Sequence, residues 1–113
     1  MMTELKNLSI TLKTRPTGIV DSENFSTKIS EVKTLKENQV LIKVLYLSLD
    51  PYMRGRMSEA KSYADPLQIG EIITAESAGI VIESKSTKYS VGEYVCCRSG
   101  WQEYFISNDK DPM

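Results

Sequence analysis

Hydrophobic and polar residues alternate along much of the chain with the period of two that is typical of β-strands. In residues 8–12, Leu8, Ile10 and Leu12 alternate with hydroxyl residues, which predicts a first strand with one buried, apolar face. The run 40–49 is rich in β-branched and aromatic residues and is apolar on most of both faces. We therefore expect it to form the long central strand.

Shorter strands are predicted further along, separated by turns. They occupy the segments 25–32, 69–73, 78–83, 91–98 and 101–106. The segments 69–73 and 78–83 form either two strands or one strand bent near Gly79. Residues 21–24 read as a polar loop, and 36–38 as a turn. Asp50 followed by Pro51 ends the long strand and favours a short helical turn over residues 51–56, because aspartate caps free N–H groups and proline suits the first helical position.

This pattern of short strands predicts a mainly β domain, a small barrel or sandwich. The chain has 113 residues, of which 41% are hydrophobic, with 14 basic and 15 acidic side chains. That length suits one domain, residues 1–113. A net charge of -1 creates no field that would gather nucleic acid or acidic lipid, so we expect neither as a partner. The first residues lack the apolar run of a secretion signal, and we expect a cytoplasmic protein.

Missing residue types exclude several kinds of chemistry. The sequence contains no histidine, which removes Ser/His and Cys/His nucleophile pairs and most catalytic zinc sites. Its glycines are too widely spaced for either glycine-rich phosphate-binding motif. Cys96 and Cys97 are adjacent, a spacing that suits neither a disulfide framework nor a tetrahedral metal site. In a strand they would point to opposite sides, one buried and one near the surface. We expect no bound metal.

The run 45–57, which contains Asp50-Pro51-Tyr52-Met53-Arg54, resembles the zinc-independent branch of the medium-chain dehydrogenase/reductase superfamily. That branch includes prostaglandin reductases, plant double-bond reductases and curcumin reductase. Other matching pieces lie in register at 15–18, 62–63, 69–70, 82–84, 91–93 and 99–104. The resemblance implies a chaperonin-10-like (GroES-like), partly open β-barrel, which is the N-terminal, substrate-side catalytic domain of complete members.

Complete members carry a Rossmann domain that binds NADPH. Because the segment 108–113 reads as a linker, we expect the chain to be the front part of a longer protein, with the Rossmann domain absent from it. The resemblance implies NADPH-dependent reduction of the C=C bond of α,β-unsaturated aldehydes and ketones by hydride transfer. We expect this chain alone to be inactive and to bind no NADPH, and we assign no cofactor-binding residue.

Tyr52 is the first candidate for a functional residue. At the end of a strand it offers a ring that can stack on a flat conjugated substrate, and a hydroxyl that is a donor at neutral pH. The resemblance places Tyr52 in the substrate cleft as a catalytic residue, with Met53 and the loop residue Tyr63 as further substrate-binding residues. The alternative is that Tyr52 caps the barrel and points its hydroxyl into solvent.

Two other interpretations stay open. Arg54 and Arg56 are spaced for phosphate binding, although an exposed charged turn is the interpretation we favour. The whole chain, as an alternative to a reductase domain, could be a free-standing β-barrel module without catalytic activity. Such a module would bind a partner or form a homodimer through apolar surfaces that the absent domain would otherwise cover.

Overall fold

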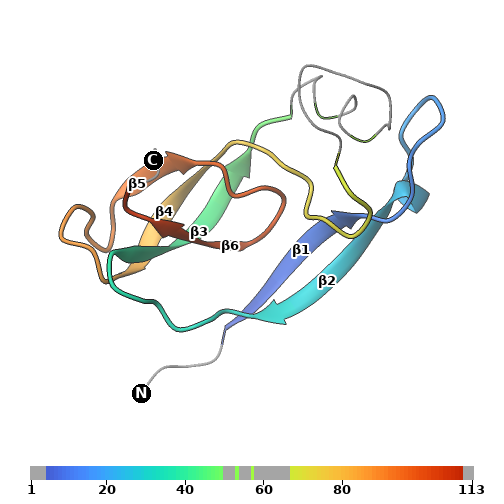
Figure 1. Ribbon diagram of the computed structural model, residues 1–113. Coiled ribbons are helices and arrows are strands. Elements are labelled where there is room, and N and C mark those ends of the chain that lie inside the picture. Colours follow the sequence, from blue (N-terminus) through green and yellow to red (C-terminus); the bar gives the residue numbers. More distant parts are fainter. Residues whose placement is uncertain (1–4, 50–52, 54–56, 58–66, 111–113) are drawn as a thin grey trace.

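The computed structural model describes residues 5–49, 53, 57 and 67–110 of the chain. Within these residues the strands form two antiparallel sheets (Figure 1). One sheet pairs β1 (Lys6–Leu12) with β2 (Phe25–Glu31). The other has the order β5 (Tyr94–Cys97), β4 (Ser77–Ser84), β3 (Gln39–Leu47), β6 (Tyr104–Asn108). The prediction of a mainly β domain is confirmed, and so is the central position of β3.

The two sheets are joined by a ring of three main-chain hydrogen bonds. The N–H of Ile10 in β1 donates to the carbonyl of Trp101, the N–H of Trp101 donates to Ile73, and the N–H of Ile73 donates to Ile10, at 2.8, 2.8 and 3.1 Å. Trp101 and Ile73 lie in the two irregular segments that run between the sheets (Figure 1). Each residue of the ring therefore has one donor and one acceptor satisfied without a regular ladder.

Each sheet has a core cluster of its own. The first cluster lies in the four-stranded sheet and contains Val40, Ile42, Val81, Val95 and Cys97. The second contains Leu12, Met57, Leu67 and Ile73, with Ile10, Val20, Phe25 and Trp101 packed against it. In the second cluster the rings of Phe25 and Trp101 lie with their centroids 5.5 Å apart. The second cluster therefore draws on residues from β1, β2 and the irregular segments, and it holds these parts together by burial.

The burial of β3 changes along its length. Its first half is buried, but Leu45, Tyr46 and Leu47 are 44%, 76% and 40% exposed. The pairing with β4 also slips here: Val44 lies opposite Gly79 and Tyr46 opposite Ala78, so Leu45 is an extra residue in β3. Such a β-bulge interrupts the alternation of side chains and increases the local twist. β3 is therefore buried over its first half and exposed at its end.

The predicted strand 69–73 does not form. Residues 68–71 make a turn in which Gly70 has a left-handed backbone, with φ 94°. A single bridge between Ile72 and Thr11 is all that remains of strand pairing there. Neither alternative, two strands or one bent strand, is therefore correct, because only the segment 78–83 forms a strand, which is β4.

The segment 21–24, which we predicted as a polar loop, contains one turn of 3₁₀ helix, Ser22–Asn24, with Asp21 as its cap.

The remaining boundaries are close to the expected ones. The turn at 36–38 is present, and β5 and β6 are shorter than the segments from which we predicted them. Met53 is helical, while the rest of the predicted helical turn 51–56 lies outside the described residues.

The adjacent cysteines of β5 face opposite sides of the sheet, as predicted. Cys96 is exposed and Cys97 is buried. The Sγ of Cys97 lies 3.3 Å from the hydroxyl of Ser77, and the hydroxyl of Ser99 donates to that of Ser77 at 2.7 Å. Burial raises the pKa of the Cys97 thiol above its ordinary value of 9.0, although the contact with Ser77 opposes this effect.

Replacing Gly100 by alanine tests the close approach at the hydrogen-bond ring. A Cβ at this position would lie 2.7 Å from the carbonyl oxygen of Ile73, and φ is 73°. Gly70 also has a positive φ, but open space surrounds it, so Gly70→Ala is the matched control. We expect Gly70→Ala to cost about 1–2 kcal/mol of the free energy of unfolding. We expect Gly100→Ala to cost about 1–3 kcal/mol more. Urea titrations that give equal losses would contradict a crowded backbone at Gly100.

Cys97 makes the stability of the domain depend on pH. A folded-state pKa above the unfolded value stabilises the fold fully below the unfolded pKa, and this contribution is lost as the pH rises through the folded pKa. The free energy of unfolding should therefore fall more steeply above pH 9.0 in the unchanged protein than in Cys97→Ala.

At about pH 8, iodoacetamide should modify Cys96 in the folded protein and reach Cys97 only in urea. Equal labelling of both thiols, measured by peptide mass spectrometry, would exclude a buried Cys97.

Candidate functional site

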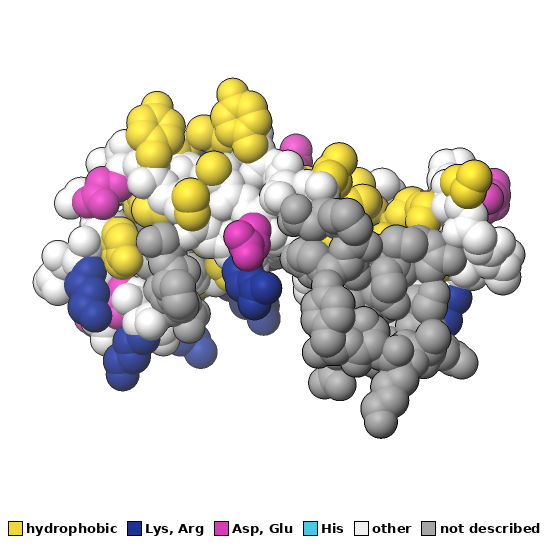
Figure 2. All heavy atoms as spheres, turned by 90° about the horizontal axis from the view of Figure 1, so that it is seen from above, with side chains coloured by type: hydrophobic (Ala, Val, Ile, Leu, Met, Phe, Trp, Pro, Cys, Tyr) yellow, Lys and Arg dark blue, Asp and Glu magenta, His cyan; other side chains and the backbone are white. Residues whose placement is uncertain are grey.

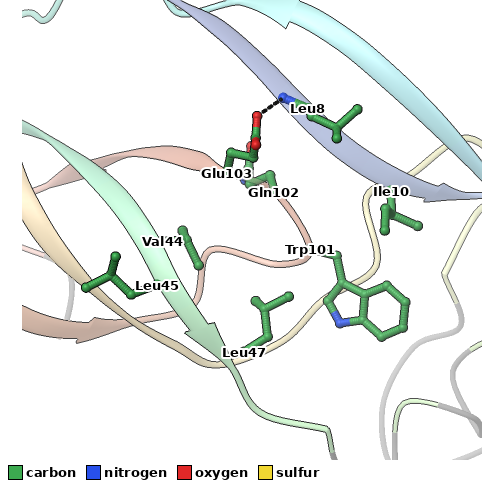
Figure 3. Close-up of a pocket in the computed structure, with 8 residues that line it drawn as sticks. All are labelled: Leu8, Ile10, Val44, Leu45, Leu47, Trp101, Gln102 and Glu103. Carbon is green, nitrogen blue, oxygen red and sulfur yellow. Dashed lines mark hydrogen bonds between the residues drawn. The ribbon is translucent and has the colours of Figure 1, made fainter.

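An apolar groove of ≈ 310 Å³ opens between the two sheets. One wall comes from β1, the other from the second half of β3, and the segment 101–103 lies between them (Figure 3). The lining residues are Leu8, Ile10, Val44, Leu45, Leu47, Trp101, Gln102 and Glu103. The volume lies at the lower end of the range for small-molecule sites.

The β1 wall agrees only in part with the predicted burial of that strand. We expected Leu8, Ile10 and Leu12 to form the buried face, and Leu12 is 0% exposed, but Ile10 is only partly buried and Leu8 is 38% exposed. The hydroxyl residues between them, Ser9 and Thr11, are instead 1% and 6% exposed. They can be buried because their hydroxyls have carbonyls of β2 as acceptors, at 3.4 Å. The apolar face of β1 is thereby left to line the groove.

The β3 wall is a consequence of the bulge at Leu45. In Figure 3 the side chain of Leu47 extends from the end of β3 toward Trp101. Leu45 and Val44 line the same groove, although neighbouring residues of a regular strand would point to opposite faces. The regular pairing of β3 with β4 is thus interrupted at the part of the strand that borders the groove. Beyond β3 the chain continues through Ser48 and Leu49 to the predicted catalytic residue Tyr52.

Glu103 connects the two walls. Its N–H donates to the carbonyl of Leu8 at 3.0 Å, and its side chain accepts from the N–H of Leu8 at 3.2 Å (Figure 3). Its carbonyl accepts from the N–H of Val44 in β3 at 2.8 Å. The carboxylate of Glu103 is thus occupied by a hydrogen bond from the backbone. Glu103 fixes the width of the groove rather than acting as an acid or base.

Trp101 supplies an unused hydrogen-bond donor beside the groove. In the described part of the protein its indole Nε1 is the one buried side-chain nitrogen or oxygen that has no hydrogen-bond partner. A buried donor without an acceptor costs about 1–3 kcal/mol, and a bound acceptor would recover part of that cost. The groove can therefore hold an apolar molecule against its aliphatic side chains and the indole ring of Trp101.

A second hollow of ≈ 320 Å³ lies on the other side of the end of β3. Its lining includes Tyr46, Ser48, Glu76 and the exposed Cys96. Figure 2 shows that hydrophobic side chains gather along one side of the four-stranded half of the molecule, with Lys and Arg on the opposite side. Together with the groove, this hollow leaves the end of β3 accessible on both faces.

The residues that the sequence singled out lie mostly beyond the described part. This holds for Tyr52, Tyr63, Arg54 and Arg56, whose roles stay predictions. Met53 is described and is 5% exposed; its contact with substrate also stays a prediction. Trp101 packs against Phe25, and the sequence pattern did not reveal that it also borders a groove.

The described residues include no group of three or more Cys, Asp or Glu side chains arranged to hold a metal ion. In the same part of the chain, no helix has the length and apolar character needed to cross a membrane.

Comparison with known proteins places this domain in a family. Residues 8–113 match the family described as the N-terminal domain of oxidoreductase. The chain is 43% identical over 106 residues to the NADPH-dependent curcumin reductase of Escherichia coli, covering 94% of this chain and 31% of that protein. It is 37% identical over 111 residues to the NADP⁺-dependent 2-alkenal reductase of Nicotiana tabacum, covering 94% and 32%.

The fold is shared as well. The crystal structure of CurA from Vibrio vulnificus superimposes with a TM-score of 0.89 at 41% identity, over 95% of this chain and 31% of that one. This match confirms the chaperonin-10-like architecture that the sequence resemblance implied. The chain spans about a third of the length of the relatives it matches. It belongs to the family of oxidoreductase N-terminal domains, in the zinc-independent branch that contains the curcumin and alkenal reductases.

Proposed function

We propose that this chain is the substrate-side domain of an NADPH-dependent reductase that reduces the C=C bond of α,β-unsaturated aldehydes and ketones. The names of two relatives, a curcumin reductase and a 2-alkenal reductase, support the reaction class. The observation that carries the proposal is the groove, because its aliphatic walls and indole ring suit an apolar, conjugated compound.

The reaction sets clear requirements for the domain. Hydride adds to the β-carbon of the enone, the electron pair of the C=C bond moves to the carbonyl oxygen as an enolate, and a proton then reaches the α-carbon. A domain on the substrate side must orient the enone, donate a hydrogen bond to the oxygen as its charge develops, and keep water out. We assign the donor role to the hydroxyl of Tyr52, whose ring would stack on the conjugated system, with Met53 and Tyr63 as neighbouring contacts.

NADPH does not fit the groove. Its lining offers aliphatic carbon, an indole, the carboxylate of Glu103 and the amide of Gln102, whose nitrogen already donates to the carbonyl of Ser99. A pyrophosphate needs several N–H donors or cationic side chains. We therefore place the cofactor outside this chain, in the remaining two thirds that the longer relatives have. In this arrangement the exposed apolar end of β3 is one wall of a cleft that the second part of such a reductase completes.

A chimaera tests the proposal. Residues 8–113 would replace the matching segment of the E. coli curcumin reductase, so that the relative supplies its own cofactor domain. We expect NADPH-dependent reduction of curcumin and of a 2-alkenal, measured as NADPH oxidation and as loss of the substrate's C=C bond by mass spectrometry. A chimaera that is folded and binds NADPH but reduces neither compound would overturn the proposal.

In the active chimaera, Tyr52→Phe should lower kcat/KM for curcumin at least about tenfold. This is the order of magnitude expected when one hydrogen bond to a developing negative charge is lost. The matched control is Tyr94→Phe, since Tyr94 is an exposed tyrosine of β5, and it should leave kcat/KM unchanged. If Tyr52→Phe has no effect either, the hydroxyl of Tyr52 points to solvent and the proposed donor role is wrong.

A free-standing dimerisation module is the second candidate function. The exposure of Leu45, Tyr46 and Leu47 at the end of β3 favours it, because a second copy could cover these side chains. An inactive chimaera, together with a stable dimer of the isolated chain in light scattering, would support this candidate instead.

A further inference from the structure

Arg15 connects two parts of the chain that are far away in the sequence. It lies three residues after the end of β1, and its guanidinium donates two hydrogen bonds to main-chain carbonyls. The Nη1 group donates to the carbonyl of Met57 at 3.0 Å, and the Nη2 group to the carbonyl of Leu67 at 2.9 Å. Both acceptors belong to the backbone, so their presence does not depend on the side chains of the residues that carry them.

The two residues that Arg15 holds are also anchored by their own side chains. Met57 and Leu67 are both buried in the second core cluster, with Leu12 and Ile73. Each is therefore fixed twice, once by packing and once by the guanidinium. Nine residues separate them in the sequence, and one of these is Tyr63, a predicted substrate contact.

The same cluster forms the support of the groove. Trp101, which lines the groove and has the unused N–H, packs against this cluster, and so does Ile10 of the β1 wall. A shift of Met57 or Leu67 would alter the packing under both groove residues, because close-packed interiors transmit small displacements. Arg15 is thus connected to the groove through residues that are all described in the structure.

The chemistry of the contact favours arginine over lysine. A guanidinium is planar and presents its N–H groups in a rigid fork, so that two separate acceptors are bound in one fixed orientation. A lysine ammonium is a point charge on a flexible stem and does not impose that geometry. Arg15→Lys therefore keeps the charge while removing the constraint.

We propose that Arg15 is a positioning residue of the substrate site, which sets substrate affinity by holding the main chain at Met57 and Leu67 under the groove. This inference rests on the proposed reductase function. Arg15 does not touch the reacting atoms, so its loss should impair binding of the enone more than the chemical step, and it should leave the cofactor unaffected.

Steady-state kinetics of the chimaera provide the test. We expect Arg15→Met and Arg15→Lys each to raise KM for curcumin about tenfold, the effect of losing a hydrogen bond to a charged group. The kcat value and the KM for NADPH should stay within about twofold, because Arg15 contacts neither the reacting atoms nor the cofactor in the proposed arrangement. Arg98→Lys is the control, since Arg98 is exposed, and it should change nothing. A normal KM in both Arg15 variants, or a full rescue by Arg15→Lys, would overturn the proposal.

A measurement on the isolated 113-residue chain separates this proposal from the proposed function. Trp101 is the single tryptophan, so its fluorescence reports on the groove directly. Arg15→Met should make Trp101 more accessible to acrylamide quenching under native conditions, while Arg98→Lys should not. Unchanged quenching would refute the role of Arg15 whether or not the chimaera reduces enones. Increased quenching with an inactive unsubstituted chimaera would instead refute the reductase function alone.

Discussion

The structure depends on the cyclic set of main-chain hydrogen bonds among Ile10, Ile73 and Trp101. The two sheets share no regular ladder in the described residues, and isolated bridges and single hydrogen bonds take its place. Because the carbonyl of Ile73 comes so close to residue 100, a glycine is needed at that position. This close approach keeps the segments around Ile73 and Trp101 packed against each other, and both segments are hydrogen-bonded to β1.

Irregular joining also explains where apolar surface remains. A continuous barrel would bury the apolar face of every strand, but here Leu8 and Ile10 of β1 face Leu47 of β3 across an open space (Figure 3). Glu103 holds the walls in place through the backbone of both strands. The hydrophobic effect gives such a surface a tendency to become covered. In the proposed function, a substrate and a second part of a longer reductase would both cover this apolar surface.

Much of the fold could be predicted from the sequence, and the errors have identifiable causes. The periodic runs gave strands at β1, β2, β3 and β4, because alternation and β-branched content are local properties. The burial of β1 was predicted only in part: Leu12 is buried, but so are Ser9 and Thr11, because their hydroxyls find acceptors on a neighbouring strand, which no local pattern reveals. The segment 69–73 has strand-like residues, but the left-handed backbone at Gly70 interrupts it.

The candidate site was less predictable than the fold. The resemblance drew attention to Tyr52 and Tyr63, whereas the groove is built from residues that look like ordinary core positions, among them Leu8, Leu47 and Trp101. Arg15 belonged to a matching piece of the family pattern, yet its contacts reach 42 and 52 residues along the chain. Such contacts depend on tertiary structure, and the unpaired indole N–H of Trp101 is visible only once the packing around it is known.

The extra residue at Leu45 has a consequence for how this domain can evolve. In a regular strand, replacing one amino acid by another does not change the face of the sheet to which that position points, so substitutions are tolerated one at a time. Here the extra residue lets Tyr46 and Leu47 pair with Ala78 and Ser77 although Val44 lies opposite Gly79. Loss of a single codon between Val44 and Tyr46 would remove the bulge and the local twist that it adds in one step, although every remaining amino acid would be unaltered. Natural variation in this strand should therefore conserve its length more strictly than its composition.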